Sequence, residues 1–454
     1  MKTLSVACAT LLAITSLAAS AAAQDISRLG QDLTPMGAER AGNAAGTIPA
    51  WEGGITKPPS TVTYQAGDHH PDPFAADAIL FTIDASNADQ YADHLTAGQQ
   101  AMIAAYPDSY RLNVYPSRRS CAYPEMVYAA ARENAETARL DNNGNNVVNA
   151  RIASPFPLPE SPVEVIWNHI LSYRGYKLTQ QEASAVPTAS GDFTLSINAD
   201  SRIILWGNPV LDDIAELDNV ESKWLRMFLA PSKAAGGGFL FFNTIDQSKE
   251  LRRGWIYNTQ NRRVTRASKS AYDSPMPTAD GLRVSDNQFM YNGAPDKYDW
   301  TLVGKREIYI PYNAYKLSSS DLQYSDIIKA KHLNPGVLRH ELHRVWVVDG
   351  TLKAGESHIF GRRTLYFDED TWTIVATDLY DREGKEIIRV QDGFLKNYYE
   401  VPLCVLDVEV IYDLPSQRYH VQGLKNQEPM PNYSADELDE EDFTPAGLRR
   451  AVAR

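Results

Sequence analysis

The stretch from residue 338 to residue 424 constrains the fold most, because it consists of successive strand-like segments. Leu406 and Val408, for example, alternate with Asp407 and Glu409. A period of two residues is typical of antiparallel strands that bury one face and expose the other to water. The expected strands are 344–348, 364–367, 371–377, 387–390, 405–412 and 418–422. The chain is therefore expected to build a large antiparallel sheet.

Helices are expected mainly before this sheet. The clearest one begins at Ser161, where Pro162 at the first helical position and Glu164 complete a capping box. Three more helices are expected: one at 88–106 that ends before Pro107, one at 124–140 that is rich in the helix formers Ala and Glu, and one at 218–229. In the last, Asp218 and Glu221 form a capping pair ahead of an apolar stripe. A hairpin is expected around Asn258-Thr259-Gln260-Asn261. The predicted fold class is α+β, with a curved antiparallel sheet covered by helices.

Composition along the chain divides it into five segments. Lys2, an apolar run over 4–17 and small residues at 21–23 predict a secretory signal peptide over 1–23. A Pro/Gly-rich segment at 24–75 is expected to be an extended arm packed on the body. The remaining segments are a mainly helical one at 76–190, a sheet body at 191–430 and an acidic C-terminal tail at 431–454.

Several function classes are disfavoured. The formal net charge of −13 argues against nucleic-acid binding, and no later stretch is apolar enough to span a membrane. His340 and His343 stand three residues apart, whereas the zinc-protease helix needs a spacing of four, so no metal site is predicted. No nucleophile elbow or phosphate-binding loop is present, and we expect neither a cofactor nor enzyme activity.

Cysteine usage leaves two alternatives open. Cys121 and Cys404 are the cysteines that follow the predicted signal peptide. An oxidising compartment permits a disulfide between them. The alternative is two isolated buried thiols, since free cysteine packs as a small apolar side chain.

Two groups of side chains are candidates for binding. Basic residues surround the predicted hairpin, locally inverting the sign of an acidic protein, and form either a solvated face or a patch that docks a partner. They are Arg252, Arg253, Arg262, Arg263, Arg266 and Lys269, of which Arg262, Arg263 and Arg266 are the predicted docking residues. Aromatic residues on predicted element faces form either plain core or the wall of an apolar cavity. The predicted cavity residues are Trp167, Trp224, Phe228, Phe239, Phe241, Trp255, Tyr257, Trp300, Trp346 and Trp372.

Several motifs together resemble one family. They are YPSRRS at 115–120, IWNH at 166–169, GWIYN at 254–258, RRVTRA at 262–267, YDWTLVGKRE at 298–307, PYN at 311–313, HRVWVV at 343–348 and YFDEDTW at 366–372. The chain is identified by them as similar to the domain of unknown function 1329 family. That family is grouped with the LolA/LolB-like periplasmic lipoprotein carriers, so the resemblance implies an incomplete antiparallel barrel around an apolar cavity and a Gram-negative periplasmic location.

The resemblance and the strand pattern together favour a carrier or chaperone for a hydrophobic ligand: a lipid, a lipoprotein acyl chain or a sterol-like molecule. The first alternative is a non-enzymatic adaptor that docks an exporter to an outer-membrane partner. A periplasmic hydrolase is the less favoured third hypothesis. The resemblance supplies no catalytic residues.

Overall fold

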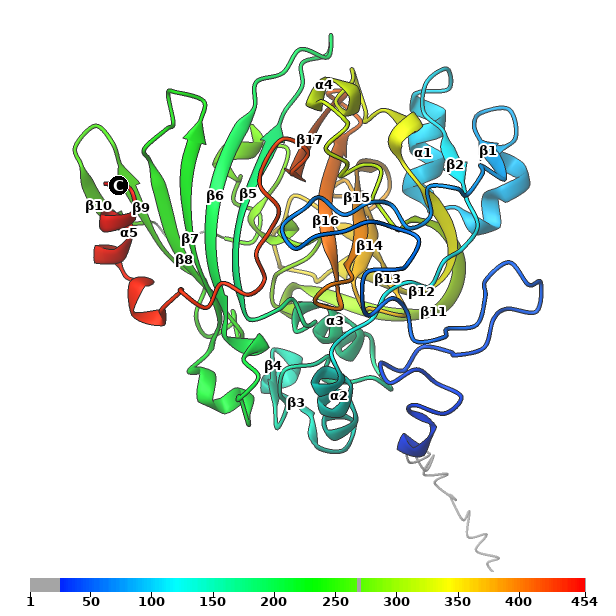
Figure 1. The fold of residues 1–454 in the computed structure, drawn as a ribbon, viewed down its shortest axis with the longest axis horizontal. Coiled ribbons are helices and arrows are strands. Elements are labelled where there is room, and N and C mark those ends of the chain that lie inside the picture. The colour runs from blue at the N-terminus through cyan, green and yellow to red at the C-terminus, as the bar shows by residue number, and fades with distance from the viewer. Residues whose placement is uncertain (1–24, 268–270, 454) are drawn as a thin grey trace, which may run out of the picture.

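A large, open, strongly curved antiparallel sheet with a few short helices makes up the protein (Figure 1). The computed structural model describes residues 25–267 and 271–453, so the predicted signal peptide and Lys269 lie outside the described residues. The helices are α1 (Ala97–Ala105), α2 (Glu125–Thr137), α3 (Pro162–Ile170), α4 (Tyr324–Ile327) and α5 (Pro445–Ala451). Within these residues, no helix has the length and apolar character that a membrane crossing requires.

Fifteen strands belong to the large sheet, and β3 (Arg139–Asp141) pairs separately with β4 (Asn146–Val148). The first strands of the large sheet are β1 (Phe81–Ile83), β2 (Leu112–Val114), β5 (Lys177–Ala185), β6 (Ser196–Ile204), β7 (Val220–Ala230), β8 (Gly238–Thr244), β9 (Arg253–Asn258) and β10 (Arg263–Arg266). The others are β11 (Tyr298–Pro311), β12 (His340–Leu352), β13 (Arg362–Asp368), β14 (Ile374–Tyr380), β15 (Ile387–Tyr398), β16 (Leu403–Asp413) and β17 (Arg418–Leu424).

The sheet is continuous but not closed. Its order is β1-β2-β12-β13-β14-β15-β16-β17-β5-β6-β7-β8-β9-β10, and β11 adds to β12. The described strands of the sheet pair with one another antiparallel, and the single bridge between β2 and β12 is parallel. Among the described residues, β10 pairs only with β9, so one edge of the sheet stays free. The predicted α+β class with an incompletely closed, curved sheet is confirmed.

The central strands are buried on both faces, which corrects the expectation of one wet face. One face packs in a cluster with Met36, α2 and α3, and the other packs against α1 and the segment between β11 and β12. The polar residues at alternate positions are therefore buried and bonded within the protein. Asp407 on β16, for example, accepts hydrogen bonds from Ser318 and Tyr398 and forms ion pairs with Lys396 and Lys425.

The predicted helix at Ser161 is confirmed as α3, including its capping box. The one predicted over 88–106 is interrupted. Residues Ala88–His94 form a 3-10 helix, after which Thr96 accepts a hydrogen bond from the Gln99 N–H and begins α1. Helix α1 therefore begins at its own N-cap residue and does not continue the 3-10 helix.

The predicted helix at 218–229 is wrong, because Val220–Ala230 form the strand β7. Asp218 and Asn219 have positive φ angles of 44° and 62°, so the chain turns at the residue expected to cap a helix. Beyond the turn, Trp224 lies opposite Arg202 on β6 and Phe241 on β8. Pairing on both sides outweighs the local helical pattern.

Both terminal segments pack on the sheet. In the arm, the carbonyl of Met36 accepts a hydrogen bond of 2.8 Å from the Trp372 indole, and the carbonyl of Cys121 accepts one of 3.2 Å from Trp51. Near the C-terminus, Phe443 and Leu448 are buried against β8, while the acidic residues before them are exposed. The described parts of the arm and tail therefore belong to the folded body.

Candidate ligand-binding pocket

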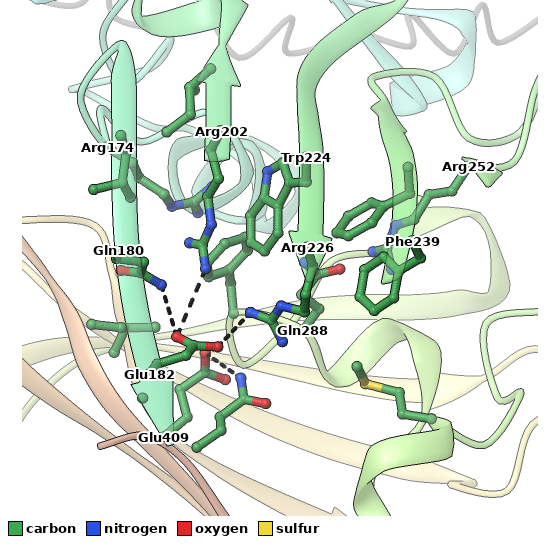
Figure 2. Close-up of a pocket in the computed structure, with 18 of the residues that line it drawn as sticks. Arg174, Gln180, Glu182, Arg202, Trp224, Arg226, Phe239, Arg252, Gln288 and Glu409 are labelled. Carbon is green, nitrogen blue, oxygen red and sulfur yellow. Dashed lines mark hydrogen bonds and ion pairs between the residues drawn. The ribbon is translucent and has the colours of Figure 1, made fainter. Parts of the chain in front are cut away.

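A cavity of about 440 Å³ lies on the inner face of strands β5–β9, where the sheet curves toward β16 and β17 (Figure 2). Alternate residues of β5 and β7 line it: Gln180 and Glu182 from β5, and Trp224, Arg226 and Phe228 from β7. The size falls within the range of small-molecule sites. The two-residue period of a strand thus brings these side chains to one surface.

The apolar wall of the pocket is aromatic. Phe228 and Phe239 have ring centroids 5.7 Å apart, Phe239 and Phe241 are 5.3 Å apart, and Phe241 and Trp224 are 5.0 Å apart. Ile256 on β9 also lines the pocket and exposes 46% of its surface, so the cavity reaches solvent there. An apolar molecule entering beside β9 would meet this wall of rings.

The wall of the cavity near β5 and β6 carries a buried ion network (Figure 2). Arg226 donates to Asp200 at 2.5 and 2.6 Å and also binds Glu182, while Arg202 pairs with Asp200. Burial opposes the charge of Asp200, yet Arg226 and Arg202 hold the pKa of this carboxyl well below its usual value. These four groups neutralise one another's charges and form the polar wall of the pocket, while Arg202 Nε stays without a hydrogen-bond partner among the described residues.

Half of the predicted cavity residues line this pocket: Trp224, Phe228, Phe239, Phe241 and Trp255, of which Trp255 also packs in the cluster on the α5 side. The structure places the other five elsewhere. Trp167, on α3, is buried in a separate cluster, and Tyr257 faces α5. Trp300, Trp346 and Trp372 belong to the cluster beside the central strands. The binding role of the five pocket aromatics stays a prediction.

Sequence reasoning missed the charged lining of the pocket. Arg226 stands between Trp224 and Phe228 at the strand period, a signal that was hidden when the segment was interpreted as a helix. Arg202 lies on β6, and its inward direction depends on the register of β6 with β7. Arg174 lies in the loop after α3, where no periodicity indicates it.

The predicted docking arginines lie apart from the pocket lining. Arg262, Arg263 and Arg266 are exposed on the β9–β10 hairpin, at the free edge of the sheet. Ala267, which follows them directly, does line the pocket. The hairpin therefore stands beside the cavity, and partner docking through it stays a prediction.

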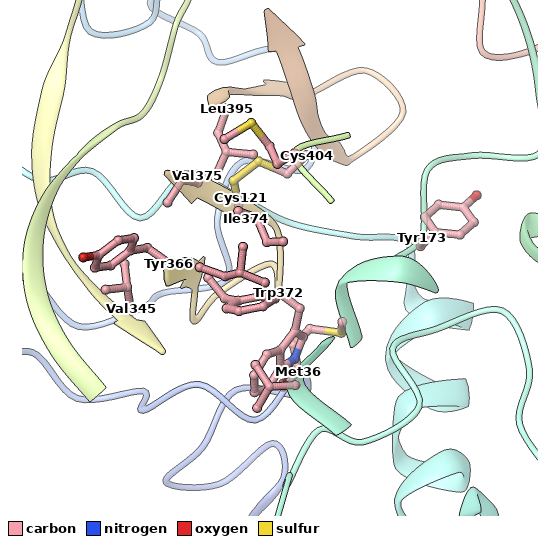
Figure 3. Packing of buried hydrophobic residues seen from close by; sticks show 14 of the residues in the cluster. Met36, Cys121, Tyr173, Val345, Tyr366, Trp372, Ile374, Val375, Leu395 and Cys404 are labelled. Carbon is pink, nitrogen blue, oxygen red and sulfur yellow. Dashed lines mark hydrogen bonds between the residues drawn. A yellow bond between two sulfur atoms is a disulfide. The ribbon is translucent and has the colours of Figure 1, made fainter. Parts of the chain in front are cut away.

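The structure joins Cys121 and Cys404 in a disulfide, with Cα atoms 5.4 Å apart (Figure 3). This is one of the two alternatives that the sequence left open. The bond links the loop before α2 to the start of β16, across 283 residues of sequence. Both cysteines are buried in the cluster that contains Met36 and Trp372.

A second group of titratable residues gathers away from the pocket. His343 lies with Asp368 and Asp370, each offering one ligand atom within 4.8 Å of the others. Both Asp370 oxygens accept hydrogen bonds from Arg119, at 2.9 and 2.6 Å, and Asp368 accepts one from Thr371. Burial and the charge of Asp370 raise the pKa of Asp368 well above its usual value. Protein partners thus already occupy most of these oxygens.

His340 and His343 lie on opposite faces of β12 because they are three residues apart on a strand.

Ser109 and His332 place a hydroxyl nucleophile beside a potential base. Ser109 Oγ lies 2.9 Å from His332 Nε2, and His332 Nδ1 lies 2.7 Å from the carbonyl oxygen of Leu333. None of these residues lines the pocket.

Comparison with known proteins gives a family. The model of the family described as protein of unknown function (DUF1329) matches residues 82–449. An uncharacterized protein of Pseudomonas aeruginosa is 44% identical over 450 residues, covering 98% of this chain and 96% of its own length.

Among solved structures, a DUF1329 family protein from Desulfovibrio piger has a TM-score of 0.41 at 12% identity, covering 60% of this chain and 92% of its own. A LolA superfamily protein from Nitrosomonas europaea has a TM-score of 0.37 at 10% identity, and the match covers 63% of this chain and 98% of that protein.

Proposed function

The chain belongs to the DUF1329 family, and from that premise we propose that it is a periplasmic, non-enzymatic carrier or chaperone for a hydrophobic ligand. The ligand class includes lipids, lipoprotein acyl chains and sterol-like molecules. The observation that carries the proposal is the pocket of about 440 Å³, with its continuous aromatic wall from Trp224 to Phe228. The predicted signal peptide supports the periplasmic location.

The energetics of such a pocket are sufficient for reversible carriage. A ligand that buries about 300 Å² of apolar surface gains roughly 7–8 kcal/mol. That gain corresponds to a dissociation constant in the micromolar range, before the cost of ordering is subtracted. A carrier needs affinity of this order, because it must release its ligand as well as hold it.

The direct test is native mass spectrometry of the purified protein, followed by organic extraction and titration with the apolar dye N-phenyl-1-naphthylamine. We expect a co-purifying lipid or saturable dye binding. Replacing Phe241, on the pocket wall, with Asp should abolish dye binding. Replacing Tyr257, which faces α5 on the other side of β9, with Phe should not. A protein that holds no lipid and binds no dye would refute the carrier.

One alternative has its own observation. Arg262, Arg263 and Arg266 are exposed on an edge hairpin, and among the described residues none of them forms an ion pair. An acidic partner would find three free guanidinium groups there. This arrangement favours an adaptor that docks an exporter to an outer-membrane protein, and it is compatible with carriage.

The contact between Ser109 and His332 is the observation in favour of a hydrolase. A histidine whose other ring nitrogen is held by a carbonyl oxygen can accept a proton from a serine. A fluorophosphonate reagent tests this possibility. Labelling of the native protein that disappears in Ser109→Ala would support hydrolysis, and absence of labelling would remove it.

A further inference from the structure

Two arginines of the pocket lack the ion pair that Arg202 and Arg226 have. Arg174 donates only to the carbonyl oxygens of Ile170 and His169. Arg252 donates to the carbonyl oxygens of Ser285 and Asn292, and makes a longer contact of 3.4 Å with the Ser285 hydroxyl. Within residues 25–267 and 271–453, no carboxylate lies within 4 Å of either guanidinium group.

A guanidinium ion that is partly withdrawn from water is costly when no counter-charge replaces the lost hydration, and Arg174 and Arg252 are both partly buried. Burial lowers the pKa of Arg252 to about 10, and it also lowers the pKa of Arg174. Each cation therefore has unused capacity to bind an anion. The Arg252 Nε atom is buried and has no hydrogen-bond partner.

The more distant carboxylates are engaged elsewhere or disposed to be neutral. Glu409, which acts on Arg174 from beyond contact distance, binds Arg283 at 2.7 Å. Asp286, which acts on Arg252, pairs with Arg363 at 3.0 Å and His358 at 3.2 Å. Glu221 acts on both arginines, but burial raises its pKa and favours the uncharged form.

The side chains that line the cavity carry an excess of positive charge. Six cationic side chains line it against three carboxylates, in a protein whose formal net charge is −13. An excess of positive charge inside an acidic protein is unexpected for a pocket that accepts only neutral hydrocarbons. It is expected for a pocket that also accepts an anion.

The free arginines adjoin the aromatic wall. The Arg174 guanidinium carbon lies 4.6 Å from the ring centroid of Phe289, and the Phe289 ring lies 5.3 Å from that of Trp224. Figure 2 places Arg174 and Arg252 on opposite sides of Trp224, and Gln288 faces the same space. The polar end of a ligand and its apolar chain would therefore find partners in one cavity.

We propose that the pocket binds an anionic amphiphile, whose carboxylate or phosphate head group is attracted by the unpaired charges of Arg174 and Arg252 while its chain lies along Phe239 and Phe241. This inference rests on the proposed carrier function and names the chemical class of its ligand. The head group supplies this part of the pocket with the negative charge that Glu182 and Asp200 supply to Arg202 and Arg226. A neutral molecule of the same length fills the pocket but leaves both cations unpaired.

The test uses matched ligands that displace N-phenyl-1-naphthylamine from the full protein, each below its micellar concentration. Dodecanoate and dodecyl phosphate carry the anion, dodecanol is neutral, and dodecyltrimethylammonium carries the opposite charge. Acetate and inorganic phosphate supply the anion without a chain. We expect the two anionic amphiphiles to displace the dye at concentrations at least tenfold lower than dodecanol, and the cation to be weakest.

Arg174→Gln and Arg252→Gln should each reduce that preference to less than threefold and leave dodecanol binding unchanged. Arg262→Gln, which removes the same charge from the exposed hairpin, is the matched control and should keep the full preference. Thermal melts verify folding. If a Gln variant does not fold, Arg252→Lys replaces it, and we expect an intermediate preference because the charge stays but the planar fork is lost.

The outcomes separate the two ideas. Equal displacement by dodecanoate and dodecanol would overturn the anionic class and leave the carrier function standing. Displacement by acetate or phosphate at the concentrations needed for the amphiphiles would also overturn it, because the site would then be one for small anions. If the dye itself does not bind, the carrier function is contradicted, and the anionic ligand class that rests on it falls as well.

Discussion

Arg202 and Trp224 lie directly opposite each other on β6 and β7, and the Arg202 guanidinium carbon sits 3.7 Å from the centre of the indole ring. The same ring contacts Phe241 on one side and Phe289 on another. Trp224 thus joins the buried ion network of the pocket to its aromatic wall. A cation over an indole face contributes on the order of 0.5–2 kcal/mol.

Replacing Trp224 with Phe should weaken binding of the apolar dye roughly threefold to tenfold, because the smaller ring loses contact with the ligand and with Arg202. Fluorescence titration measures this change. Trp167→Phe is the matched control, since Trp167 is buried outside the pocket and hydrogen bonds to the Gly144 carbonyl. The control should lower the melting temperature and leave dye affinity intact; an equal loss of affinity in both variants would contradict the assignment of Trp224.

Replacing Cys121 and Cys404 together with Ala should lower the free energy of unfolding by about 2–5 kcal/mol, since the bond closes a long loop in the unfolded chain. Urea unfolding monitored by tryptophan fluorescence measures the difference. Wild-type protein treated with a reducing agent is the control, and it should lose a similar amount. Unchanged unfolding midpoints in both samples would show that the crosslink does not contribute to stability.

Asp378 and Asp392 should make stability fall as pH rises. Burial raises the pKa of Asp378 to about 6 and that of Asp392 to about 7, from 3.8. Between pH 3.8 and the folded pKa of each group, the folded protein holds more protons than the unfolded chain. The free energy of unfolding therefore falls by roughly 1.4 kcal/mol per pH unit for each group over that range. Their full stabilising contribution is therefore present only below about pH 4.

Asp392→Asn removes one of these titrations. The stability of the wild type relative to this variant should fall steadily between about pH 4 and pH 7 and then stay level. Chemical unfolding at a series of pH values gives the difference. Asp436→Asn, at an exposed residue of the C-terminal segment, is the control and should run parallel to the wild type. A parallel curve for Asp392→Asn would mean that Asp392 titrates normally.

Reversing Arg262, Arg263 and Arg266 to Glu should leave the melting temperature unchanged, because exposed side chains rarely contribute more than about 0.5 kcal/mol. If the hairpin docks an acidic partner, capture of that partner from envelope extracts should be lost. Reversal of three other exposed cations, Lys57, Arg382 and Lys385, to Glu gives the same change in net charge and is the control. Equal capture by both variants would exclude the hairpin as a docking surface.

The sequence predicted the strands better than the surroundings of the strands. Alternation in 405–412 identified β16, yet the residues that cover its second face come from distant segments. Asp407 looks solvent-facing in the sequence, but Ser318 and Lys425 bond to it in the interior. Local pattern records which residues share a face, and it cannot record that a remote segment will cover the polar face.

The error at β7 has a related cause. Asp218 and Glu221 mimic a helix cap, and the apolar residues that follow fit a helical stripe as well as a strand. Backbone pairing with β6 on one side and β8 on the other makes this segment a strand. Strand Ile374–Tyr380 was also expected to start at Thr371, but Trp372 has a φ of 61° and belongs to the turn.

At the site, sequence reasoning found aromatic residues by type and could not sort those of the pocket from those of the core. Phe239 and Trp346 are both aromatic residues on predicted strands, so the sequence does not distinguish a pocket residue from a core residue. The curvature of the sheet places the first at the pocket and the second at the core. Arg174 carried no signal, because its direction is set by carbonyl groups at the end of α3. Charged residues inside a cavity become evident only when their partners, or the lack of them, can be located.

The strand order has a consequence for how the molecule is made. The last strand, β17, lies in the middle of the sheet, where it joins β16 to β5. Strands β5–β10 therefore cannot attach to the rest of the sheet until nearly the whole chain is available. Such long-range pairing is slow to form. If the chain crosses a membrane unfolded, its pocket can be assembled only after the C-terminal strands have arrived, so the ligand site would come into existence last.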